Sequence, residues 1–225
     1  MSIGRQISAA PPAQPWPRRM FGGGTAGNEQ LTAVTGLVLI VLLAVIGVTI
    51  LRLRGPLLSI HLFVGIALIG PVALKLASTG YRFVRYYTAN PRYRSKGPPA
   101  IALRVIAPFV VLSTVVVFVS GVVLLFAGPS SRDTLLPIHK VSFFVWVAFT
   151  AIHVLAHLPA VIRVLTAKST ASPLDGGFAD RLRELDGRGG RAVSLAGAIV
   201  LGVVLAILVI PEFGPWLSTH GFHHH

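Results

Sequence analysis

Four histidines are the residues of this chain whose type and spacing could do chemistry. His61, His139, His153 and His157 all fall in or beside long apolar stretches, where an ionisable side chain is costly and marks a candidate functional site. A neutral imidazole binds a metal ion through one ring nitrogen. The chain has no cysteine, which excludes disulfides, iron–sulfur clusters, thiolate metal sites and thiol catalysis. Redox chemistry would therefore need a cofactor that other ligands hold.

Three of these histidines lie on one face of one expected helix. His139 and His153 are 14 residues apart, and His157 follows four residues later. At 3.6 residues per turn, the first two face the same way and are separated by about 21 Å along the helix axis. This separation suits two stacked macrocycles and is too long for one metal ion bound by both side chains.

The composition predicts a membrane bundle that would position these histidines. Of the 225 residues, 53% are hydrophobic and 12% are charged, whereas about a quarter of a soluble domain is charged. About 20 apolar residues cross a bilayer as a helix. The predicted fold class is therefore all-α, a polytopic membrane helical bundle of five transmembrane helices at residues 31–51, 56–77, 105–127, 137–162 and 192–210, with Pro137 in the first turn of the fourth.

The polar segments complete the expected organisation. We expect a disordered cytoplasmic segment at 1–30, a four-helix haem-binding core at 31–165, a cytoplasmic loop at 166–191, and the fifth helix with an extracytoplasmic tail at 192–225. The Arg18–Arg19 pair faintly resembles a twin-arginine signal, but the apolar run that follows is too long for one, which predicts a retained anchor. The terminal run His223–His225 is either native or the remnant of a purification tag.

The positive charge predicts the orientation of the chain. The net charge of +13 would suggest nucleic acid in a soluble protein, but here the cations lie between apolar spans, so no nucleic-acid partner is expected. With a cytoplasmic amino terminus, 15 of the 20 Lys and Arg residues lie inside, four lie outside, and Lys75 lies in the membrane. The positive-inside rule then places the carboxyl terminus outside the cell (inner) membrane.

In this orientation the second and fourth helices run parallel, and two histidines lie at one depth. His61 follows Arg54 by seven residues, and His139 follows Asp133 by six. Imidazoles on two parallel helices at matched depth predict bis-imidazole ligation of the iron of a b-type haem. Gly65 and Gly121 would leave room for its flat ring.

Charged residues near the histidines admit several interpretations. Arg54, Arg132 and Lys140 could pair with haem propionates or could be interface charges. Lys75 lies 14 residues after His61, at the depth of His153. It could snorkel to the interface, neutralise a propionate, or ligate a second haem opposite His153, with His157 as an alternate. One haem is therefore expected, and a second is allowed.

Two hypotheses compete with haem. His153 and His157 form an i, i+4 pair that could bind Zn²⁺ or Cu²⁺, although no third ligand is expected at their depth. The chain could also be a haem-free scaffold or transporter whose histidines serve as hydrogen-bond, proton-relay or metal sites.

The end of the second span interleaves aromatic rings with cations between Gly80 and Tyr87. This segment is either an aromatic belt with stop-transfer charges or a docking surface for anionic lipid headgroups.

In its histidine pattern the chain resembles the transmembrane cytochrome b superfamily, over about residues 31–162. This superfamily includes di-haem b561-type subunits, the membrane subunits of formate dehydrogenase and hydrogenase, and the haem-bearing half of quinol-oxidising cytochrome b. His139 and His153 match the spacing of histidines in that last group, and His61 matches the first ligand of the partner helix. Lys75 departs from the pattern, which has a fourth histidine there.

The resemblance implies an electron-transfer subunit of a larger oxidoreductase rather than a stand-alone enzyme. Such a subunit lies in the lipid bilayer and exchanges electrons with a quinone or a partner redox protein. The segment 61–157 also resembles small actinobacterial membrane proteins thought to partner extracytoplasmic molybdopterin oxidoreductases, which implies a partner of that kind.

Overall fold

The protein is built from helices throughout the part that its structure, a computed structural model, describes: residues 24–51, 53, 55–88, 90–94, 101–166 and 187–218. Within these residues there is no strand. The α-helices are α2 (Gly24–Ile50), α3 (Pro56–Ala67), α4 (Ile69–Tyr87), α5 (Pro91–Arg94), α6 (Ile101–Ala127), α7 (Arg132–Thr166), α9 (Arg188–Val209) and α10 (Gly214–Ser218), and the 3₁₀ turns are η1 (Pro129–Ser131) and η2 (Ile210–Phe213).

Five helical stretches are long and apolar enough to cross a membrane. They are Gly27–Ile50, Pro56–Tyr87, Leu103–Ala127, Pro129–Ala156 and Arg188–Ser218. This result confirms the predicted all-helical fold with five candidate membrane spans, as an integral membrane protein has.

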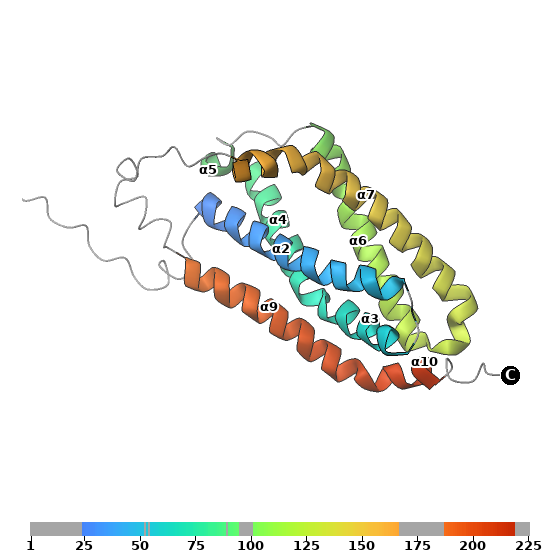
Figure 1. Ribbon diagram of the computed structural model, residues 1–225. Coiled ribbons are helices and arrows are strands. Elements are labelled where there is room, and N and C mark those ends of the chain that lie inside the picture. Colours follow the sequence, from blue (N-terminus) through green and yellow to red (C-terminus); the bar gives the residue numbers. More distant parts are fainter. Residues whose placement is uncertain are drawn as a thin grey trace, which may run out of the picture.

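The five spans form two groups. The helices α2, α3, α4 and α9 pack together, with α9 along one side of the continuous α3–α4 span (Figure 1). The helices α6 and α7 form a long hairpin on the other side, and they meet the first group mainly where α3 approaches α6. The site described below lies where these two groups meet.

The second span is divided at Leu68 into α3 and α4, but its backbone hydrogen bonds continue through this residue. The Leu68 N–H donates to the Val64 carbonyl at 2.9 Å, and the Val72 N–H donates to the Leu68 carbonyl at 2.9 Å. Pro71 has no N–H, so it cannot donate to the carbonyl of Ala67 four residues earlier. A Cβ placed on Gly202 of α9 would collide with this same carbonyl, so α9 packs directly against the backbone that the proline leaves free.

Several helix ends differ from the sequence-based prediction. Residues 24–30, expected to be disordered, form the first turns of α2, and residues 188–191, expected in a loop, begin α9. The helix α7 begins at Arg132, so Pro137 lies inside it and not in its first turn. Asp133 in the actual first turn favours this start, because a carboxylate is stabilising near a helix N-terminus.

The apolar runs locate only the hydrocarbon-spanning part of each helix, whereas backbone hydrogen bonding continues into the flanking polar residues. The rest of the expected terminal segments and of the 166–191 loop lies at residues 1–23, 167–186 and 219–225, outside the described residues.

Candidate functional site

A cavity of about 300 Å³ separates α3 from the α6–α7 hairpin, and both His61 and His139 line it. We call it the His61–His139 cavity. Gly65 of α3 and Gly121 of α6 line it as well. The structure therefore brings together His61 and His139, which were expected at one depth of the membrane, along with both glycines. This volume is at the lower end of the range of about 300–1,000 Å³ that small-molecule pockets have.

The imidazole of His61 is held by a hydroxyl group of the preceding span. Its Nδ1 lies 3.0 Å from the Oγ1 of Thr49, a residue only 2% exposed. The Thr49 hydroxyl donates its single proton to the Ile46 carbonyl at 2.6 Å. With its proton on that carbonyl, the Thr49 oxygen accepts from Nδ1–H of His61, and this tautomer of the neutral ring has its lone pair on Nε2.

The imidazole of His139 is held in the same way. Its Nδ1 lies 3.0 Å from the Oγ of Ser120 on α6, and this hydroxyl donates to the Val117 carbonyl at 3.0 Å. Ser142 lies 3.0 Å from Ser120 and donates to the carbonyl of His139 at 2.8 Å. With its proton on the Val117 carbonyl, Ser120 accepts from Nδ1–H of His139, and this tautomer also has its lone pair on Nε2. Nε2 is then the nitrogen of each ring that a metal ion would use.

The two glycines have different roles at the cavity. A Cβ on Gly121 would lie 3.0 Å from Cε1 and 3.4 Å from Nδ1 of His139, so the glycine allows that ring to sit against the backbone of α6. A Cβ on Gly65 would meet no atom within 4 Å. Gly65 therefore widens the cavity, whereas Gly121 lets the His139 imidazole lie against α6.

The walls are mostly apolar, with cations among the lining residues. Phe118, Leu124, Phe143 and many aliphatic side chains line the cavity, as do the predicted residues Arg132 and Lys140. Arg54, the third predicted cation, lies outside the described residues.

Trp216, which the sequence analysis did not single out, also lines the cavity from α10. Its indole N–H donates to the Leu125 carbonyl on α6 at 3.1 Å, and its side chain is only 7% exposed. The last part of the fifth span, beyond the apolar run at residues 192–210, is therefore part of the site. Trp216 lies beyond the apolar run, where the pattern gave no reason to expect a buried ring.

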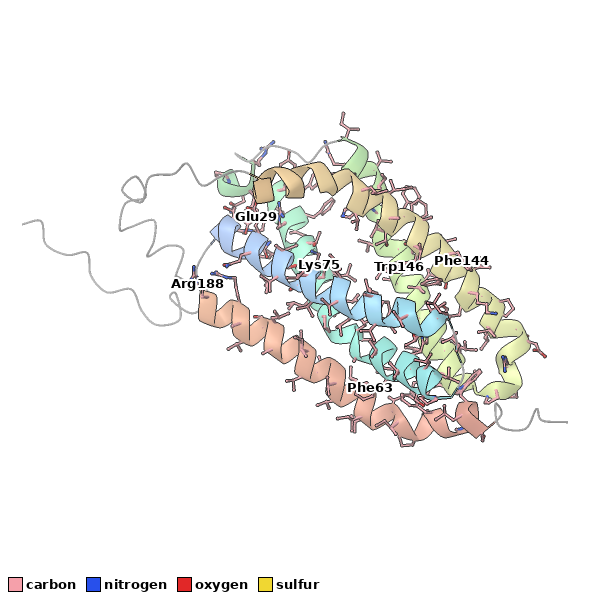
Figure 2. The ribbon with its side chains drawn as sticks, in the orientation of Figure 1. Glu29, Phe63, Lys75, Phe144, Trp146 and Arg188 are labelled. Carbon is pink, nitrogen blue, oxygen red and sulfur yellow. The ribbon has the colours of Figure 1, made fainter. Side chains whose placement is uncertain are left out.

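Lys75 lies elsewhere, on the face of α4 that meets α2. Its ammonium group donates to the Thr32 carbonyl at 2.6 Å, and a Cβ on Gly36 would lie 3.0 Å from Nζ. Ser78 adds a second contact between the same two helices through the Thr32 hydroxyl, at 3.1 Å. Figure 2 shows Lys75 beside α2.

Two of the other predicted ligands, His153 and Lys75, are not among the described residues that line the cavity. His153 is half-buried on α7, which packs on α6, whereas Lys75 is directed to α2, so the expected pair does not meet. His157 belongs to α7, but its side chain lies outside the described part of the chain. Among the residues whose positions are described, no group of three or more His, Cys, Asp or Glu side chains could hold a metal ion.

The donor set of the His61–His139 cavity fits a b-type haem. It offers two imidazoles, open space beside Gly65, apolar walls and cations suited to carboxylate groups. Comparison of the chain with protein-family models, with curated proteins and with solved structures gave no match.

Proposed function

We propose that this chain is a membrane-bound b-type cytochrome in which His61 and His139 are the axial ligands of one haem. The observation that carries the proposal is the pair of imidazoles on α3 and α7, which line one cavity and are each anchored through Nδ1 by a hydroxyl group. A histidine that only links two helices by a hydrogen bond does not require a cavity beside it.

The protein's own groups would prepare the site for the cofactor. Thr49 and Ser120 hold the tautomer and orientation of the two rings, as hydrogen-bond partners of metal-bound histidines do. The apolar walls exclude water, and Arg132 and Lys140 would offset the charge of propionate groups. The bound haem would supply one-electron exchange between ferric and ferrous iron.

The proposal covers one haem. Lys75 has its ammonium protons directed to a backbone carbonyl of α2, so it offers no lone pair towards α7. We propose that the chain works as a subunit that exchanges electrons with a quinone or with a partner redox protein, because its described residues consist almost entirely of the spans and their short connectors.

The spectrum of the purified protein tests the proposal. We expect reduction by dithionite to produce α and Soret bands at a stoichiometry of about one haem per chain, the number of bis-imidazole sites the cavity offers. His61→Ala and His139→Ala should each abolish these bands. His153→Ala is the matched control, since it removes a half-buried histidine of α7 outside the cavity, and it should retain the full complement.

Three outcomes would overturn the proposal. A colourless full-length protein, isolated from membranes with ample haem, would favour the haem-free scaffold or transporter. Retention of the full haem complement in both His61→Ala and His139→Ala would show that other residues are the ligands. Bound zinc that is lost in His157→Ala, without a visible spectrum, would favour metal transport.

A further inference from the structure

The segment from residue 80 to 104 carries an unusual balance of charge. It contains six Lys and Arg residues and no Asp or Glu. The second candidate span ends within it, at Tyr87, so these cations lie where a membrane-crossing helix leaves the hydrocarbon region. The segment itself therefore has no acidic side chain to balance these charges.

Four side chains of this segment form a cluster, which we call the Arg85 cluster: Tyr81, Arg82 and Arg85 of α4 and Tyr93 of α5. The Arg85 guanidinium lies 5.9 Å from the centre of the Tyr81 ring, and the Tyr81 and Tyr93 rings meet edge to face at 6.1 Å. The phenol of Tyr93 lies close enough to Tyr81, Arg82 and Arg85 to interact with them electrostatically. The cluster therefore gathers two guanidinium groups and two phenol groups at one place.

The Arg85 side chain lies against the Tyr81 ring, but its hydrogen-bonding capacity is not fully used. It is half-buried, and its Nε–H is buried without a hydrogen-bond partner among the described residues. An unpaired buried donor on a cation is costly. The neighbouring Arg82 has the Glu29 carboxylate 3.6 Å away, so this acid is directed to Arg82. Arg85 is thus a cation that lies against the Tyr81 ring and has no acidic partner among the described residues.

The Tyr hydroxyls add to the donor capacity of the cluster. Burial raises the pKa of Tyr93, and Tyr81 beside it acts in the same direction, so the phenol keeps its proton near neutral pH. A protonated phenol can donate to an anionic oxygen, as a guanidinium does. This set of donors suits a phosphate group, whose several oxygens can accept from more than one side chain.

The surroundings of the cluster indicate where the phosphate comes from. Val84 lies between Tyr81 and Arg85 in sequence and is 55% exposed, and Tyr81 itself is 51% exposed. An apolar surface beside a phosphate site at the end of a membrane span would contact acyl chains, which a free anion does not have. We propose that the Arg85 cluster binds the phosphodiester headgroup of an anionic phospholipid. This proposal is independent of the proposed haem site.

Lipid titration of the purified full chain in detergent tests the inference, with native mass spectrometry as the readout. Phosphatidylglycerol should bind, and phosphatidylcholine with the same acyl chains should bind at least about tenfold more weakly. Arg85→Gln should weaken phosphatidylglycerol binding by about tenfold, the scale of one lost charge-assisted hydrogen bond. The affinity of Arg85→Lys for phosphatidylglycerol should lie between those of the unmodified chain and Arg85→Gln, because lysine keeps the charge but lacks the planar group that stacks on the ring.

Arg104→Gln is the matched control. Arg104 of α6 is exposed and donates to the Tyr87 hydroxyl at 2.9 Å, outside the cluster, so its loss should change binding by less than about twofold, as expected of a screened exposed charge. Equal weakening by Arg104→Gln and Arg85→Gln would show that diffuse charge attracts the lipid, and would overturn the inference. Displacement of the lipid by inorganic phosphate at equal concentration would identify a free-anion site instead, and would also overturn it. Circular dichroism confirms that each variant remains helical.

Discussion

At the scale of single residues, His61 and His139 are held in the same way, each by a hydroxyl group of a neighbouring helix. Each Nδ1 lies 3.0 Å from a hydroxyl group on the helix that precedes it in the chain, and each hydroxyl donates to a carbonyl of its own helix. Hydroxyl groups of membrane helices commonly bond back to their own backbone, so Thr49 and Ser120 did not stand out in the sequence. Only the packing of neighbouring helices shows that they orient the imidazoles.

Thr49→Val tests this supporting role. The substitution removes the acceptor of the His61 Nδ1–H, and we expect haem affinity to fall by about 10- to 100-fold. The midpoint potential of the remaining haem should rise, because a histidine that loses this hydrogen bond is a weaker donor to ferric iron. Haem retention during dialysis and a redox titration of the α band measure the two effects.

Thr35→Val is the control for that substitution. Thr35 is buried in the same helix and bonds to the Leu31 carbonyl at 2.7 Å, away from the cavity. Thr35→Val should leave both the haem affinity and the midpoint potential of the haem unchanged. Equal effects of the two substitutions would mean that Thr49 acts only through helix stability.

Lys75→Met tests the placement of the lysine. Because its ammonium group bonds to the Thr32 carbonyl of α2, we expect the haem stoichiometry and the reduced spectrum to remain as in the unmodified chain. The free energy of unfolding should fall by about 1 kcal/mol, as for interhelical hydrogen bonds in membrane proteins. Loss of a low-spin signal would instead make Lys75 a haem ligand. Absorption spectra and unfolding in a denaturing detergent measure the two quantities.

At the scale of elements, α9 packs more closely against α3 and α4 than its uniformly apolar sequence predicted. A Cβ on Gly70 of α4 would collide with the Ala198 carbonyl, and a Cβ on Gly202 of α9 would collide with the Ala67 carbonyl. The two backbones therefore touch reciprocally, in the close approach that small residues allow between membrane helices. The fifth span supports the helix that carries His61.

Gly202→Ala should separate these helices. The added methyl group cannot avoid a backbone carbonyl, so we expect a loss of about 1–3 kcal/mol in the free energy of unfolding. Gly197→Ala on the same helix is the matched control, because a Cβ there meets nothing within 4 Å. It should be neutral or stabilising by up to about 1 kcal/mol, since alanine favours helix over glycine. Thermal unfolding of the two variants in one detergent compares them. A Gly202→Ala variant as stable as Gly197→Ala would contradict the reciprocal contact.

At the scale of the whole molecule, the described residues form two helical groups (Figure 1). These groups meet at the His61–His139 cavity, and α10 contributes Trp216 to its lining. Each group contributes one histidine together with the hydroxyl group that holds it. Ligation of one haem by both groups would therefore also join them.

The orientation of the whole molecule is a prediction from charge alone, and the absence of cysteine makes it easy to test. We expect Ser130→Cys, in the exposed turn before α7, to react with a membrane-impermeant maleimide in intact cells. Thr88→Cys, at the exposed end of α4, should react only after the membrane is opened. The unmodified chain is the blank, since it has no thiol. The opposite pattern would contradict the positive-inside argument.

The sequence alone determined the helical class, the five spans and the pairing of His61 with His139, because apolar length and the 3.6-residue period are local properties. Only the tertiary structure decided which neighbour each side chain meets. It directed Lys75 to α2, gave both imidazoles their hydroxyl partners, and brought Trp216 to the cavity from beyond the apolar run at residues 192–210. The reason is physical: helix rotation and packing depend on contacts between residues far apart in the chain, and periodicity carries no information about them.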